Sequence, residues 1–150
     1  MSQSLAQILV HLVFSTKEHY PFIEETVEAK LFAYIGDTIK RLGGAPIKIN
    51  GMPDHIHVLS SMPKTLSLAT YVEQIKRNSS RWIKGKGGML EKFGWQNGYG
   101  AFSVSSSQKA ALIAYILNQK NHHKTMTFKD EFTAFLQKYG IEYDPRYVWG

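Results

Sequence analysis

Apolar residues follow two kinds of pattern in the first part of the chain. Residues 5–14 form a run rich in leucine, isoleucine and valine, which predicts a buried central strand. From residue 23 to residue 42 the apolar residues recur at helical spacing, and Gly43-Gly44 then ends the predicted helix. The chain is therefore predicted to begin with a strand followed by a helix.

A pair of antiparallel strands is predicted next, over residues 47–50 and 55–60. The dipeptide Asn50-Gly51 favours a turn between them. Met52 and Pro53 then make the predicted loop longer than the two-residue minimum of a hairpin.

Helical spacing returns over residues 67–84, followed by a glycine-rich loop at 85–88 and a predicted strand over 98–105. The apolar face of this second helix consists of Leu68, Val72, Ile75 and Trp82.

Two more helices are predicted after that strand. Ser105-Ser106-Ser107 offers N-caps for a third helix over about 108–122. Residues 127–130 resemble a capping box for a last helix that ends near Gly140. The resulting order predicts an α+β fold with a ferredoxin-like (RRM-like) antiparallel sheet, helices on one face and an additional C-terminal helix. We see no repeat or domain boundary, so residues 1–150 are predicted to form a single domain.

Amino-acid composition limits which partners and which metal ligands the protein can use. The formal net charge of +6 at pH 7 favours an anionic partner such as nucleic acid. The chain has no cysteine, so a metal ion would have to be held by histidine and oxygen ligands. No apolar run approaches the roughly 20 residues of a membrane span, and the N-terminus lacks a secretory signal pattern. A cytoplasmic protein with no membrane partner is therefore expected.

Two histidines in the predicted strand 55–60 suggest a metal site. Alternate side chains of a strand point to the same face, so His55 and His57 share one face while Ile56 and Val58 pack on the other. Two imidazoles placed in this way can converge on one metal ion.

The predicted third helix adds two candidate groups. Tyr115 and Gln119 are four residues apart, which places them on one helical face. Together with His55 and His57, the amide oxygen of Gln119 would hold a divalent ion with positions open for a phosphate. Tyr115 would stand beside that ion as a nucleophile.

Three segments together resemble the HUH-type single-tyrosine transposases of small insertion sequences, including their domesticated, repeat-associated relatives. They are residues 11–17 (HLVFSTK), 53–59 (PDHIHVL) and 115–119 (YILNQ). The resemblance spans most of the chain, and Ile56 is the hydrophobic residue between the two histidines of the HUH motif.

The resemblance implies a DNA transposase that cleaves and rejoins single-stranded DNA and recognises hairpins at element ends. A metal ion on His55, His57 and Gln119 would polarise the scissile phosphate. Tyr115 would attack that phosphate, leaving a 5′-phosphotyrosine and a free 3′-hydroxyl. The expected ion is magnesium or manganese: imidazole ligands favour manganese and cellular abundance favours magnesium. The family also implies a homodimer, in which the tyrosine helix can pack against the partner's HUH face.

Other histidines leave alternatives open. His122 or His123 follows Gln119 on the same helical face and is an alternative third ligand. Alternatively, both serve with Lys124 as positive charge at a helix C-terminus. His11 is predicted to be a packed, hydrogen-bonded residue of the sheet.

Basic residues gather between residues 76 and 92, where six lysines and arginines are opposed by one glutamate. Such a run is either a solvated surface or a track for the DNA backbone. The predicted contacts to nucleic acid are Lys17, Lys76, Arg77, Arg81, Lys84 and Lys120. Trp95, Tyr99 and Phe102 are aromatic groups that could stack on unpaired bases, although core packing is predicted for most of them.

A second functional hypothesis is a non-catalytic or domesticated nucleic-acid-binding protein of the same fold. It predicts DNA binding without a covalent adduct and without metal dependence. The chain contains no Gly-x-Ser-x-Gly motif, P-loop or dinucleotide-binding fingerprint.

Overall fold

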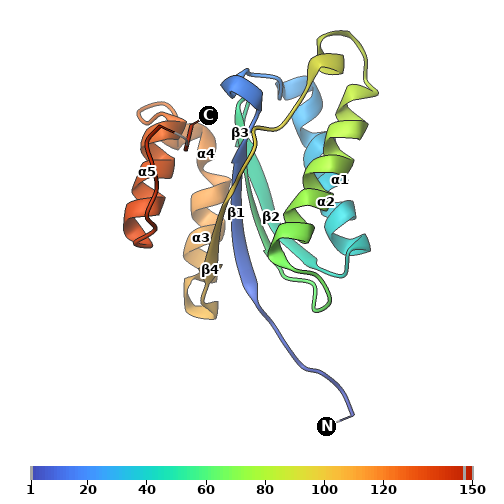
Figure 1. The fold of residues 1–150 in the computed structure, drawn as a ribbon, viewed down its shortest axis with the longest axis vertical. Coiled ribbons are helices and arrows are strands. Elements are labelled where there is room, and N and C mark those ends of the chain that lie inside the picture. Colours follow the sequence, from blue (N-terminus) through green and yellow to red (C-terminus); the bar gives the residue numbers. More distant parts are fainter. Residues whose placement is uncertain (1, 147, 150) are drawn as a thin grey trace.

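A four-stranded sheet lies between two groups of helices in the computed structural model, which describes residues 2–146, 148 and 149 (Figure 1). The strands are β1 (Leu9–Ser15), β2 (Ala45–Met52), β3 (His55–Ser61) and β4 (Gly100–Val104). The helices are α1 (Glu25–Arg41), α2 (Leu68–Lys84), α3 (Lys109–Leu117), α4 (Gln119–His122) and α5 (Phe128–Lys138). Short 3-10 turns lie at Lys17–His19, Gly88–Lys92 and Ser106–Gln108.

The sheet confirms the predicted α+β, ferredoxin-like fold, but α3 and α4, like the C-terminal helix, lie on the face opposite α1 and α2, so the helices are not confined to one face. Its strand order is β2-β3-β1-β4, and each neighbouring pair is antiparallel. β1 and β3 are the two central strands, and their register places Val13 opposite His57. Both strands are almost entirely buried because helices cover both faces of the sheet.

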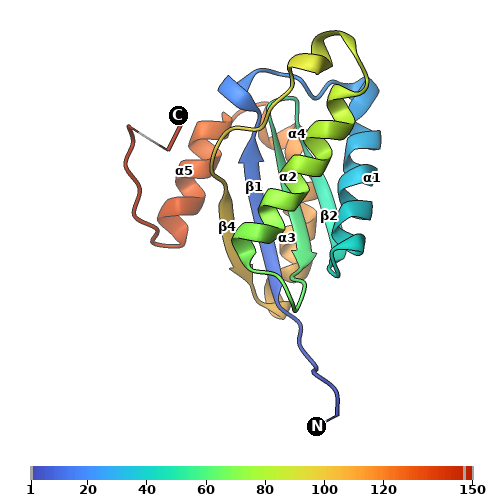
Figure 2. The same ribbon diagram turned by 45° about the vertical axis from the view of Figure 1, so that its right-hand side comes forward.

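The two faces differ in composition. α1 and α2 cover one face, where the larger apolar core includes Leu12, Phe14, Ile56 and Val58 (Figure 2). α3, α4 and α5 lie on the opposite side of the sheet. Two smaller apolar clusters pack there, one around Phe102 and Phe132 and one around Leu59 and Ile116. The functional candidates lie on this second face.

The predicted start of the first strand and the predicted apolar face of the second helix need correction. β1 begins at Leu9 because residues 5–8 leave the sheet, and Leu5 and Ile8 are exposed. The predicted apolar face of α2 is also partly wrong, since Leu68 is exposed while Tyr71 and Ile83 are buried.

The turn predicted at Asn50-Gly51 is wrong. Both residues belong to β2, paired with His57 and Ile56, and the chain reverses at Pro53-Asp54. Glycine is required at position 51 for close packing: a Cβ there would lie 2.3 Å from the carbonyl oxygen of His55. The glycine therefore permits a close strand approach, not a turn.

The predicted third helix is interrupted at Asn118, which separates α3 from α4. The break is matched by a residue of β2, the strand that α3 contacts: the Asn50 side-chain amide donates to the carbonyls of Ile116 and Leu117, at 3.0 and 3.2 Å. These carbonyls are thereby satisfied without a further helical turn. The predicted serine caps are also wrong, because α3 begins after Gln108 with no side-chain cap.

The N-cap half of the capping box predicted for α5 is confirmed. Its N-cap is Thr127, whose hydroxyl accepts a hydrogen bond from the Asp130 amide at 3.2 Å.

Candidate active site

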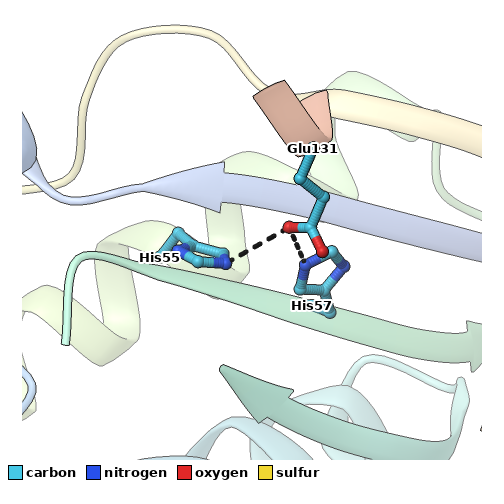
Figure 3. Close-up of side chains that lie close together, drawn as sticks. All are labelled: His55, His57 and Glu131. Carbon is cyan, nitrogen blue, oxygen red and sulfur yellow. Dashed lines mark hydrogen bonds and ion pairs between the residues drawn. The ribbon is translucent and has the colours of Figure 1, made fainter. Parts of the chain in front are cut away.

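His55 and His57 leave β3 on the face that α3, α4 and α5 cover, and a carboxylate from α5 meets them (Figure 3). The Glu131 Oε1 atom lies 2.9 Å from His57 Nε2 and 3.4 Å from His55 Nε2. All three side chains are buried. The predicted orientation is confirmed, since Ile56 and Val58 belong to the core on the opposite face.

Tyr115 and Gln119 both reach Glu131 despite the break between α3 and α4. The Tyr115 hydroxyl donates a hydrogen bond to Glu131 Oε2. The Gln119 side-chain amide donates to the same oxygen at 3.0 Å, and its Oε1 lies 3.2 Å from His55 Nε2. The predicted nucleophile, the predicted ligands and Glu131 therefore form one cluster within a single chain.

Glu131 was not singled out from the sequence, although a signal existed. In α5 it lies three residues after Phe128 and four before Phe135, on the stripe that faces the sheet. A carboxylate on the apolar face of an amphipathic helix is costly to bury unless it is paired. The sequence signal for Glu131 is therefore an acidic residue on the apolar face of the predicted last helix.

The hydrogen-bonding groups around His55 suit a bound cation. Asp54 Oδ1 lies 2.8 Å from His55 Nδ1, and an ionised carboxylate can only accept, so Nδ1 carries a proton. The other nitrogen, Nε2, then faces Gln119 Oε1 and Glu131 Oε1. Lone pairs that converge in this way require either a second proton on His55 or a metal ion. Imidazole nitrogen and carboxylate or amide oxygen are suitable donors for a divalent ion.

Burial and charge pull the pKa values of this cluster in opposite directions. Burial disfavours a charged His55, but hydrogen bonds and charges of Asp54 and Glu131 outweigh it and raise its pKa. For His57, burial dominates and lowers the pKa. Burial opposes an ionised Glu131, yet its hydrogen bonds to both histidines and Tyr115 hold its pKa below the usual range.

The pKa of Tyr115 is raised, first by burial and then by the hydrogen bond and charge of Glu131. The resting phenol is therefore protonated. A cavity of about 490 Å³ between α3 and α5 is lined by Tyr115, Glu131, Lys138 and Tyr139, so the half-buried phenol borders open space.

The remaining histidines occupy distinct positions. His123 Nε2 lies 3.2 Å from Glu131 Oε1, whereas His122 stacks on the Tyr115 ring with centroids 4.3 Å apart. His11 is fully buried and its Nε2 lies 2.8 Å from Nδ1 of His57, which confirms the prediction of a packed, hydrogen-bonded sheet residue.

The predicted DNA contacts are not all equally available. Lys17, Arg77, Arg81 and Lys84 are exposed. Lys76 is half-buried, donates to the carbonyls of Gln96 and Gly98, and burial lowers its pKa to about 8.

Lys120, the last of these predicted contacts, ties α4 to the neighbouring elements. It donates to the Gly51 carbonyl at 2.7 Å and pairs with Glu28 at 2.8 Å. Among the aromatic candidates, Phe102 is buried, Trp95 packs partly against the core, and Tyr99 is 39% exposed.

Two buried histidines of a ferredoxin-like sheet meet a buried carboxylate from α5 and a half-buried tyrosine from α3, and together they define a candidate metal-assisted site. Residues 4–119 match the model of the family described as "Transposase IS200 like". The chain therefore belongs to the IS200-like transposase family, and its function is that of a DNA-processing transposase of insertion sequences. No curated protein matches it.

Solved structures share the fold. One is a protein of Deinococcus radiodurans R1 described as a candidate transposase, with TM-score 0.61 and 22% identity over 77% of this chain and 93% of the other. Another is a REP-associated tyrosine transposase bound to a REP hairpin, with TM-score 0.56 and 12% identity over 82% and 74%. In the described part of this chain, no helix has the length and apolar character needed to cross a membrane.

Proposed function

We propose that this transposase cleaves and rejoins single-stranded DNA through a covalent bond to Tyr115. The observation that carries the proposal is the hydrogen bond from the Tyr115 hydroxyl to Glu131, inside the cluster that contains His55 and His57. A nucleophile and a potential metal-binding set within contact of one carboxylate are the parts that transesterification of a phosphodiester requires.

We infer that His55, His57 and Glu131 hold a divalent ion, magnesium or manganese, and that Gln119 contributes its amide oxygen. When bound, such an ion supplies charge stabilisation at the scissile phosphate and the leaving 3′-oxygen. Residues of the protein itself carry out the bond-forming and bond-breaking steps. The Tyr115 oxygen attacks phosphorus and forms the 5′-phosphotyrosine bond, while the 3′-oxygen leaves and takes up a proton as a hydroxyl.

Glu131 is placed to assist this attack. Its Oε2 accepts the hydrogen bond from the Tyr115 hydroxyl and is therefore the atom positioned to receive the phenolic proton. The Gln119 amide, 3.0 Å from the same oxygen, orients the carboxylate. In the reverse reaction a second 3′-hydroxyl attacks the phosphotyrosine and releases Tyr115, so strand joining needs no nucleotide cofactor.

The proposed DNA partner is a hairpin with adjoining single strand. The exposed residues Arg77, Arg81 and Lys84 offer positive charge to its backbone, and Tyr99 offers a ring for an unpaired base. The REP-associated transposase bound to its hairpin supports a hairpin as the substrate class. Arg81→Ala should weaken binding and reduce its salt dependence about equally for different hairpin sequences.

The experiment mixes the protein with labelled hairpin DNA that carries a single-stranded extension, in the presence of Mn²⁺. We expect a denaturation-resistant protein–DNA adduct, which Tyr115→Phe should abolish. Tyr139→Phe is the matched control, because Tyr139 lines the same cavity and should remain active. An adduct that persists in Tyr115→Phe, or one that forms equally well in chelator, contradicts the proposal.

Within the proposed homodimer, we infer that Tyr115 acts in cis, because it donates a hydrogen bond to Glu131 of its own chain, and the same carboxylate contacts His57. Mixing Tyr115→Phe with His57→Ala distinguishes the two arrangements. Chains that exchange the tyrosine helix would restore cleavage in the mixture, whereas cis sites leave it inactive.

A further inference from the structure

His11 of β1 lies beside His57, at the ring nitrogen that does not face Glu131. The His11 Nε2 atom is 2.8 Å from His57 Nδ1, and the two rings stack with centroids 5.1 Å apart. On its other side, His57 Nε2 is 2.9 Å from Glu131 Oε1. Each ring nitrogen of His57 therefore has one buried protein partner.

These two partners determine which nitrogen of His57 carries the proton. An ionised Glu131 only accepts hydrogen bonds, so in the absence of a metal ion the proton lies on His57 Nε2. His57 Nδ1 then accepts from His11 Nε2. The 2.8 Å separation of these two nitrogens fits a single N–H···N hydrogen bond between two rings that each carry one proton.

A metal ion reverses this requirement. A ligating Nε2 must offer its lone pair, so the His57 proton must then lie on Nδ1, where it needs an acceptor. The only partner in reach of Nδ1 among the described residues is His11 Nε2. His11 must therefore donate in one state and accept in the other.

The other ring nitrogen of His11, Nδ1, allows His11 Nε2 either to donate or to accept. Its Nδ1 is buried, and among the described residues it has no hydrogen-bond partner; the rings of Phe102 and Phe135 pack around it. His55 is different, because Asp54 holds its Nδ1 and fixes one tautomer. Of these two histidines, only His57 therefore has a partner at Nδ1 that can either donate or accept a hydrogen bond.

We propose that His11 is a positioning residue that reverses its hydrogen bond to His57 when a metal ion enters the site. His57 moves its proton from Nε2 to Nδ1, and His11 moves its own from Nε2 to Nδ1. The pair holds two protons before and after, so no acid or base is consumed. The inference rests on the metal site of the proposed function.

NMR of ¹⁵N-histidine-labelled protein tests the exchange, because long-range ¹H–¹⁵N correlations report which ring nitrogen is protonated. The probe is Zn²⁺, a diamagnetic ion that binds imidazole readily. We expect His11 and His57 to be protonated at Nε2 without Zn²⁺ and at Nδ1 with it. Phe102→Leu is the matched control: it alters the packing against His11 but removes no hydrogen bond, and it should show the same exchange.

Calorimetric titration provides a second readout. His11→Leu, which can neither donate nor accept, should weaken Zn²⁺ binding by about 10-fold or more. His11→Gln should recover most of the affinity, because an amide can do either.

The possible results distinguish a failure of the His11 inference from a failure of the metal site. If Zn²⁺ binds the wild type but His11 keeps its proton on the same nitrogen, the inference is overturned and the metal site stands. If the wild type does not bind Zn²⁺, both are overturned. Equal affinities of wild type and a folded His11→Leu also contradict the inference, and the wild-type spectra decide it even if that variant does not fold.

Discussion

Alternate residues of the central strands β1 and β3 face opposite sides of the sheet, and the two sides differ in chemistry. Phe14 and Ile56 face α1 and α2 in an apolar core, whereas His57 and Val13 face the opposite side, where α5 brings a carboxylate. Apolar contacts are non-directional, so the first face tolerates many combinations of side chains. The second face requires specific donors and acceptors, because every buried polar group needs its partner.

The contrast shows where stability and function reside. Residues of the apolar face should mainly affect the free energy of unfolding. Residues of the polar face should affect metal binding and cleavage, with smaller effects on folding. Four predictions test this separation, beginning with the largest expected effect on stability.

Phe14→Ala should lower the free energy of unfolding by about 3–5 kcal/mol, because it empties a fully buried position beside Trp95. Denaturant titration measures the loss. Phe14→Leu keeps most of the volume and should cost less than about 1.5 kcal/mol. The separation between the faces breaks down if the folded fraction of Phe14→Leu loses metal binding.

Glu131→Leu should cost about 1–3 kcal/mol, because it leaves the hydrogen bonds of His57, Tyr115 and Gln119 without an acceptor. The folded pKa of Glu131 lies below its ordinary value of 4.5, so its contribution is complete above that value. It is lost as pH falls below it, and the stability difference between wild type and variant should shrink there. A variant that is more stable and still binds Mn²⁺ would contradict the role of this carboxylate.

Mn²⁺ at about 100 times its dissociation constant should stabilise the wild type by about 2.7 kcal/mol, because the ion binds only the folded site. Thermal unfolding measures the shift in Tm. Phe14→Leu should respond as the wild type does, and His55→Ala should not respond. Gln119→Ala and His123→Ala, compared in the same assay, decide which of the two contributes a ligand; we expect the larger loss for Gln119→Ala.

Thr127→Ala should cost about 1 kcal/mol, the smallest effect in the series, because it removes the N-cap of the helix that carries Glu131. Ser105→Ala is the control, since the Ser105 side chain caps no helix. Comparable losses in both variants would show that the capping hydrogen bond does not hold α5 in place.

Local patterns were sufficient to predict most of the fold. The alternation at residues 55–58 predicted which side chains face the core, and Thr127 predicted the start of α5. Both signals act within a few residues. The Asn50-Gly51 turn failed because turn propensity is also local, whereas Gly51 is needed for a close approach between strands. The break at Asn118 depends on Asn50, which is distant in the sequence.

The candidate site was predictable only in part for the same reason. His55, His57, Tyr115 and Gln119 were found because short spacings connect them in pairs. Glu131 is 74 residues from His57, and no spacing relates them. Only the tertiary fold brings α5 over the histidines. A buried acidic residue on an apolar helical face is nevertheless a useful signal of a polar partner elsewhere.

The central claim is that Tyr115 becomes covalently attached to DNA at a site supported by Glu131 and the two histidines. Peptide mapping by mass spectrometry tests it most directly, after reaction of the wild-type protein with hairpin DNA and Mn²⁺ and digestion of the adduct. The account predicts a nucleotide remnant on the phenol oxygen of Tyr115, absent when the metal is chelated. A remnant on another residue, or no covalent product under these conditions, would contradict it.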